Sequence, residues 1–171
     1  MDNITQIDFN IAQLRPYINW LYFYHAWGLA GKPQSEKDKL LSEANAMLDQ
    51  LEARSNTHAL VGLFDTNADG DDIVVGTERM PMLRQQRPSA PGVPYLCLAD
   101  FVRPLSSGIK DRVGVFAASI DESVEHDFQH DDFQRMLAQT LADRLAEATA
   151  ELTHLQVRRT IWGYAPDENL D

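Results

Sequence analysis

The order of helical and strand patterns along the chain predicts an α+β fold with an antiparallel sheet. A helical pattern covers residues 35–52, short strand patterns follow in the middle of the chain, and a long helical pattern covers 128–158. Strands grouped apart from helices are typical of antiparallel α+β proteins, whereas parallel sheets need a crossover, usually a helix, between strands. We therefore expect one domain over residues 1–171, with the sheet flanked by helices.

The first helical pattern has a single apolar stripe. Its members fall at i, i+4, i+7, i+8 and i+11, on one face of a helix, and they are Leu40, Ala44, Met47, Leu48 and Leu51. Ser35 is the expected N-cap, with acidic residues in the first turn. The preceding aromatic segment, 20–27, fits either a helix or a strand, and the sequence leaves that choice open.

The middle of the chain is expected to form four short strands, at 59–64, 73–75, 95–101 and 112–117. Turn-forming residues at 65–70 join the first two strands. Four prolines within 81–94 indicate a loop without regular structure. The long helical pattern that follows carries one apolar face, made of Leu137, Leu141, Leu145, Ala148, Leu152 and Leu155.

Composition and charge exclude several classes of function. The 171 residues carry 15 Lys and Arg against 26 Asp and Glu, a formal net charge of −11 at pH 7. Nucleic acids and anionic lipid surfaces repel such an acidic chain. The chain opens without the pattern of a signal peptide, and its most apolar stretch, 20–29, is too short to cross a membrane. Because the single Cys97 fits a reducing compartment, we expect a cytoplasmic protein that binds neither nucleic acid nor membrane.

Two motifs have part of a metal-binding pattern. Asp65-x-Asn67-x-Asp69-Gly70 matches the first half of a calcium loop, but Gly76 stands where that loop needs a bidentate Glu. His126 and His130 lie at i, i+4 among carboxylates, without an HExxH pattern or a third ligand fixed by spacing. A tight acidic hairpin and a solvated helix start are the better interpretations, so we expect no metal site.

Catalytic motifs are also missing from the sequence. Cys97 lies in an apolar pattern without a second cysteine or a neighbouring base, which favours a buried structural thiol. No GxSxG, P-loop or GxGxxG motif occurs, so hydrolase, nucleotidase and dinucleotide-binding functions gain no support.

The long helix carries polar residues away from its leucine stripe. Asp143, Glu147 and His154 are spaced by four and seven residues, which places them on roughly one face. A solvated surface explains this pattern. A carboxylate on a rigid helix also suits the acceptance of hydrogen bonds from a ligand amine or a ribose hydroxyl. Spacing alone does not decide between the two.

A series of short motifs carries a resemblance to a known family. The longest is Leu141-Ala142-Asp143-Arg144-Leu145-Ala146-Glu147-Ala148, followed by Glu151, His154, Val157, Arg158 and Trp162-Gly163-Tyr164-Ala165-Pro166. Further motifs precede it: Arg15-x-Tyr17-Ile18-x-Trp20, Trp27-x-Leu29-Ala30-Gly31, Gly70-Asp71-Asp72-Ile73, Cys97-Leu98-Ala99-Asp100-Phe101-Val102, Gly114-x-Phe116-Ala117 and His130-Asp131-Asp132-Phe133. From about residue 10 to 170, the chain resembles the C-terminal activation domain of cobalamin-dependent methionine synthase.

The resemblance implies a curved α+β body that binds S-adenosylmethionine beside the cobalamin-carrying domain of the same enzyme. After accidental oxidation of cob(I)alamin, reduction by flavodoxin or an equivalent is coupled to methyl transfer from S-adenosylmethionine, which restores methylcobalamin. The chain has no cobalamin-binding motif and no homocysteine or folate module, so it is not a complete enzyme alone. Its expected partners are a cobalamin-binding domain or methionine synthase chain, through which alone it would meet cobalamin, and a flavodoxin-like reductant.

The resemblance also implies which residues bind the ligand. Glu147 matches the family's Glu and would accept hydrogen bonds from S-adenosylmethionine. Asn19 stands where the family has an Asp and would contact the amino-acid end of the ligand, without a charge to meet its ammonium group. The acidic face around Asp143 would lie near the corrin. The family's downstream Arg-Pro-x-Pro-Gly-Tyr-Pro segment has no counterpart, because the sequence stops at Asp171.

Two functions follow from this resemblance. The first is a free-standing reactivation module, since Met1 lies just before the matching region. The alternative is a degenerate interaction module that has lost S-adenosylmethionine binding and docks on a corrinoid or methionine-synthase partner. The missing segment and Asn19 favour the alternative, and a shortened chain would explain the missing segment equally well.

Overall fold

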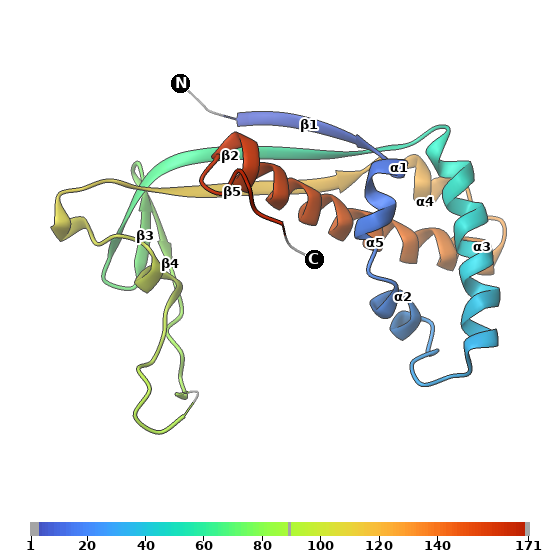
Figure 1. Ribbon diagram of the computed structural model, residues 1–171, viewed down its shortest axis with the longest axis horizontal. Coiled ribbons are helices and arrows are strands. Elements are labelled where there is room, and N and C mark those ends of the chain that lie inside the picture. The colour runs from blue at the N-terminus through green and yellow to red at the C-terminus, as the bar shows by residue number, and fades with distance from the viewer. Residues whose placement is uncertain (1–3, 89, 170–171) are drawn as a thin grey trace. The chain divides into compact units, whose positions relative to one another are not determined.

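The computed structural model describes residues 4–88 and 90–169 (Figure 1). The expectation of a free-standing module rests on Met1, and the missing C-terminal segment was inferred from Asp171. Both residues lie outside the described ranges. The described residues form two compact units. Ile4 and Val61–Val115 belong to the first unit, and Thr5–Leu60 with the residues from Phe116 onward belong to the second. The expectation of one domain over 1–171 stays a prediction.

The sheet holds the strands in the order β1 (Ile4–Asn10), β2 (Asn56–Asp69), β3 (Asp72–Val75) and β4 (Glu78–Pro81), and β5 (Asp111–Ile120) also pairs with β2. The β2–β3 and β3–β4 pairings are antiparallel. The predicted α+β fold with an antiparallel sheet and a long C-terminal helix is confirmed.

Two tight hairpins shape the first unit. Asp69 pairs with Asp72, and Val75 pairs with Glu78, so each turn has two central residues. Gly70 and Gly76 occupy the first central positions with φ of 64° and 60°. A positive φ at this position alone is the geometry of a type II′ turn, which glycine adopts without strain and which matches the twist of the strands.

The second unit is built around the long helix α5 (Asp132–Gln156). The helices α1 (Ile11–Leu14), α2 (Trp20–Ala26) and α3 (Gln34–Glu52) pack against α5, and α4 (Ser123–His126) precedes it (Figure 1). Both predicted apolar stripes supply the core: Leu40, Ala44, Met47, Leu48, Leu51, Leu137, Leu141, Leu145, Ala148 and Leu152 are buried, and Leu155 packs against them half-buried. The segment 20–27, which the sequence left open between helix and strand, forms α2 up to Ala26.

Two expected helix ends are wrong. The helix predicted over 35–52 begins at Gln34 after Pro33, which has an extended ψ of 148° and no capping side chain, so Ser35 lies inside the first turn. The helix predicted over 128–158 begins at Asp132, because residues 127–130 form a turn and the extended Asp131 caps the helix by accepting the Gln134 backbone N–H at 2.8 Å. It passes at Val157–Ile161 into a π-helix.

Three predictions for the middle of the chain, a turn, a loop and a strand, also need correction. The turn predicted over 65–70 is shorter, since β2 continues to Asp69 and pairs with β3. The loop predicted from residue 81 onward begins one residue later, because Pro81 is the last residue of β4, a strand that the sequence did not predict. The strand predicted over 95–101 is a 3₁₀ turn at Leu98–Phe101, because the Asp100 carboxylate accepts the Cys97 N–H at 2.8 Å and folds the chain back on itself.

Candidate functional site

Asn19, the first residue implied as a ligand contact, lies at the N-terminus of α2. Its side-chain carbonyl oxygen accepts the Tyr22 backbone N–H at 3.4 Å, a typical N-cap contact that satisfies one free donor of the helix. The side chain is exposed, and its amide N–H groups make no hydrogen bond within the described residues. Asn19 can therefore donate to a ligand while it caps the helix.

Glu147 lies in the middle of α5, outside the leucine stripe. Its Oε2 pairs with Arg144, one turn earlier on the same helix, and 39% of its side chain is exposed. The Arg144 guanidinium in turn lies over the Tyr22 ring, with Cζ 5.9 Å from the ring centroid. The structure thus connects Glu147 to Asn19 through Arg144 and Tyr22, which places both implied ligand contacts in one neighbourhood of α2 and α5.

The other two polar residues on this helix differ in their surroundings. Asp143 is exposed one turn before Glu147 and makes no hydrogen bond or ion pair within the described residues. His154 is also exposed, but its ring packs edge-on against Phe116 of β5, with centroids 4.7 Å apart. Asp143 therefore extends the acidic face of Glu147, whereas His154 has a packing role.

The partial metal motifs hold no ion-binding cluster within the described residues. In the calcium-like motif, Asp65 pairs with Lys110 at 3.0 Å, and Asn67 donates to two backbone carbonyl oxygens. His126 ends α4 and His130 precedes α5, so the two rings do not share one helix face as their spacing suggested. The tight acidic hairpin and the buried Cys97 are confirmed.

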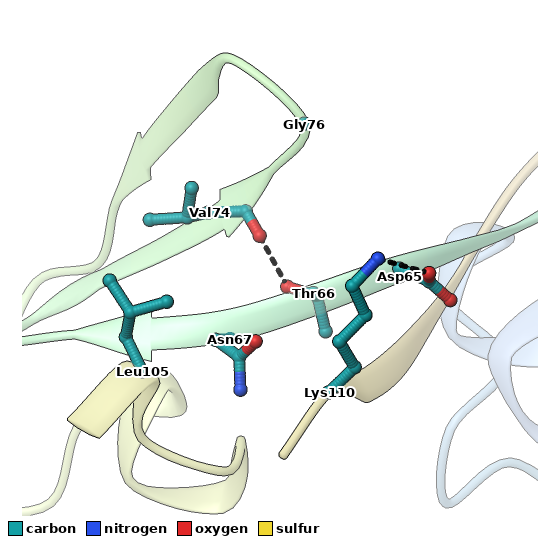
Figure 2. Close-up of a pocket in the computed structure, with 7 residues that line it drawn as sticks. All are labelled: Asp65, Thr66, Asn67, Val74, Gly76, Leu105 and Lys110. Carbon is teal, nitrogen blue, oxygen red and sulfur yellow. Dashed lines mark hydrogen bonds and ion pairs between the residues drawn. The ribbon is translucent and has the colours of Figure 1, made fainter. Parts of the chain in front are cut away.

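The first unit contains a cavity of about 220 Å³ beside the β2–β3 hairpin. Figure 2 shows Lys110 directed toward Asp65 and the Thr66 hydroxyl bonded to the Val74 carbonyl oxygen at 2.8 Å. The remaining lining residues are Asn67, Gly76 and Leu105. Because Asp65, Thr66, Asn67 and Lys110 already have hydrogen-bond or ion-pair partners, this cavity offers a ligand few free groups.

The second unit contains a cavity of about 280 Å³ near the C-terminal end of α5. Its lining is Tyr17, Glu151, Leu155, Arg158, Arg159 and Asn169. Arg158 pairs with the Glu168 carboxylate, and Arg159 donates from Nε to the Glu168 carbonyl oxygen at 2.8 Å. Both arginines thus hold the last described turn, and Asn19, Asp143 and Glu147 do not line this cavity.

The sequence did not reveal two charged clusters. His58 of β2 lies between two carboxylates, with Nδ1 2.8 Å from Asp8 and Nε2 2.9 Å from Asp121. Arg84 bonds to Asp71, to Asp100 and to the Tyr95 carbonyl oxygen. Hydrogen bonds from Arg84 and from the Cys97 N–H lower the pKa of Asp100 to about 2. No spacing signal connects these residues, because they meet only after folding.

No helix within residues 4–88 and 90–169 combines the length and the apolar character that a membrane span requires. The expected absence of membrane binding and the expected cytoplasmic location both stay predictions.

Comparison with known proteins identifies the family. Residues 10–171 match the model of the activation domain of vitamin B12-dependent methionine synthase. The fold is also similar to a crystal structure of the MetH reactivation domain bound to AdoHcy, with a TM-score of 0.88 and 39% sequence identity. That similarity covers 98% of this chain and 58% of the other chain. The chain therefore belongs to the activation-domain family of vitamin B12-dependent methionine synthase.

Proposed function

We propose that this chain binds S-adenosylmethionine through Glu147 and Asn19 and serves as a reactivation module for a cobalamin-dependent methionine synthase. The similarity to a reactivation domain bound to AdoHcy, at 39% identity, carries the proposal. This chain spans 58% of the length of that relative, so the ligand, the partners and the reaction are proposals for this chain.

The donors and acceptors of the site fit such a ligand. Arg144 contacts only Oε2 of Glu147, which leaves Oε1 free to accept a hydrogen bond from a ligand amine or hydroxyl. Asn19 has free amide donors, and its carbonyl oxygen retains a second lone pair beside the one that takes the Tyr22 N–H. Both side chains are fixed by regular structure, one within a long helix and one at a helix start.

The residues of this chain bind and orient rather than transfer protons. S-adenosylmethionine supplies an activated methyl group when it is bound. Glu147 holds the ligand from the rigid α5, Asn19 contacts its amino-acid end, and the exposed Asp143 continues the acidic face toward the partner. The partner is a cobalamin-binding domain or a methionine synthase chain, which would hold the cobalamin, and a flavodoxin-like protein would serve as the reductant.

Isothermal titration with S-adenosylmethionine tests the proposal. Wild type should bind, and Glu147→Ala should lose at least tenfold in affinity, because a hydrogen bond to a charged group contributes about 1.5–3 kcal/mol. Glu151→Ala is the matched comparison, since Glu151 is exposed one turn later on the same helix. Loss of binding in Glu151→Ala alone would place the ligand in the neighbouring cavity and contradict the proposal, as would a silent wild type.

The alternative of an interaction module without a ligand is favoured by one observation. Asn19 and Glu147 both have partners within the chain, in Tyr22 and Arg144. If the module only docks, its affinity for a cobalamin-carrying partner should be the same with and without saturating S-adenosylmethionine. A reactivation module should instead bind that partner more tightly when the ligand is present.

A further inference from the structure

The Glu147 carboxylate already has a cation beside it in the folded chain. Arg144 pairs with Glu147 at i, i+3, and its side chain is only 21% exposed. Its guanidinium also rests over the Tyr22 ring, a second contact that orders it. The carboxylate of Glu147 and the ring of Tyr22 both contact the Arg144 guanidinium, so its position beside Glu147 is fixed by two contacts.

We propose that Arg144 sets the charge selectivity of the ligand site, an inference that rests on the proposed function. A carboxylate alone favours a cationic ligand over a neutral one of the same shape. With Arg144 beside it, the pair carries no net charge, and the preference of Glu147 for a cation is largely cancelled. The site therefore accepts S-adenosyl ligands with and without a charge on sulfur to a similar extent.

Two S-adenosyl ligands that differ in the charge on sulfur test the effect of Arg144 on charge selectivity. S-adenosylmethionine carries a positive sulfonium, whereas S-adenosylhomocysteine lacks the methyl group and that charge. Both share the adenosine, the ammonium and the carboxylate. The methyl contribution to the ratio of their dissociation constants is common to all variants, so the change in this ratio between variants reports the charge preference of the site. A general loss of local structure weakens both ligands alike.

The charges around the pair define the controls. Asp143, one turn before Glu147, keeps the surroundings acidic in every variant. Arg135 forms another i, i+3 pair on the same helix, with Asp132 at 2.8 Å. It lies nine residues from Arg144, about 13 Å along the helix and beyond the Debye length of about 8–10 Å at physiological salt. Arg135→Gln thus removes the same charge outside the site.

The experiment measures both dissociation constants for the folded wild type and five variants. In Arg144→Gln, the preference for S-adenosylmethionine over S-adenosylhomocysteine should rise about two- to fivefold, as expected for an ion pair at a partly exposed site. In Glu147→Gln, which keeps an acceptor oxygen, the preference should fall by a similar factor. The double variant should return to the wild-type ratio, and Arg144→Lys and Arg135→Gln should both keep it.

An unchanged ratio in Arg144→Gln would overturn the proposal, because Arg144 would then only support local structure. That result leaves the proposed function intact if wild type binds S-adenosylmethionine and Glu147→Ala binds it at least tenfold more weakly. Absence of binding in wild type would instead overturn both. A thermal melt of each variant verifies that the protein is folded, so that a change in selectivity cannot result from unfolding.

Discussion

At the scale of single residues, a hydroxyl buried in the leucine stripe of α5 shows what the pattern of apolar residues leaves out. Thr149 and Thr57 are fully buried. The Thr149 hydroxyl lies 2.8 Å from Thr57 Oγ1 and 2.7 Å from the Leu145 carbonyl oxygen. One hydroxyl hydrogen serves only one of these acceptors, so Thr57 supplies the hydrogen for the contact between the two hydroxyls. This hydrogen bond, rather than apolar packing, joins α5 to the start of β2 at this point.

We predict that Thr149→Val, which keeps the shape of the side chain, lowers the free energy of unfolding by about 1–3 kcal/mol, because it leaves the buried Thr57 hydroxyl unpaired. The double variant Thr57→Val/Thr149→Val should cost less than the sum of the two single changes, since neither partner is then left alone. Urea unfolding measures all four proteins. Additive losses would show that the two hydroxyls do not interact.

At the scale of elements, the spacing of apolar residues predicted the long helices, whereas the turns fixed by side-chain hydrogen bonds were missed. The helices around residues 34–52 and 132–156 repeat their apolar residues over many turns, so their existence and their buried faces were predicted. The segment 95–101 is apolar but does not form a strand, because the Asp100 carboxylate accepts hydrogen bonds from the Cys97 N–H and from Arg84. In the candidate site, the family resemblance pointed to Glu147 and Asn19. It did not point to the Arg144–Tyr22 contact, which exists only once α2 packs on α5.

His58 connects three elements in the second unit and makes their stability depend on pH. Each ring nitrogen faces a carboxylate, Asp8 of β1 on one side and Asp121 after β5 on the other. Only the doubly protonated ring donates to both, and these two hydrogen bonds raise the pKa of His58. The same contact lowers the pKa of Asp8, and the Asn56 N–H together with His58 lowers that of Asp121.

The signs of these shifts set the pH window. The contribution of His58 is complete below the ordinary histidine pKa of about 6.5 and is lost as the pH rises through its raised value. The contribution of the two carboxylates is complete above their ordinary pKa of about 4 and is lost as the pH falls through their lowered values. We predict that His58→Gln lowers the melting temperature most between about pH 4 and 6.5, and least at alkaline pH. His130→Gln, at an exposed histidine, is the control, and a pH-independent difference for His58→Gln would contradict this account.

At the scale of the whole molecule, the two units differ in the size of their cores. Among the described residues, the first unit buries Val61 and a small apolar cluster of Ala68, Ile73, Cys97 and Ala99, against a far larger set around α5 in the second. A core of that size does not offset the conformational entropy of some fifty ordered residues. The strands β2 and β5 supply residues to both units, so the first unit depends on strands whose other ends are ordered by the second.

We therefore predict one cooperative unfolding transition for the chain. The distribution of probes allows a direct test, because Trp20, Trp27 and Trp162 all lie in the second unit and the single Cys97 is buried in the first. Tryptophan fluorescence and the reactivity of the Cys97 thiol toward a disulfide reagent should change at the same urea concentration, as two-state unfolding requires. Cys97→Ser removes the thiol signal and confirms its source. If the thiol became reactive well below the fluorescence midpoint, the first unit would unfold on its own, and residues 1–171 would not form a single domain.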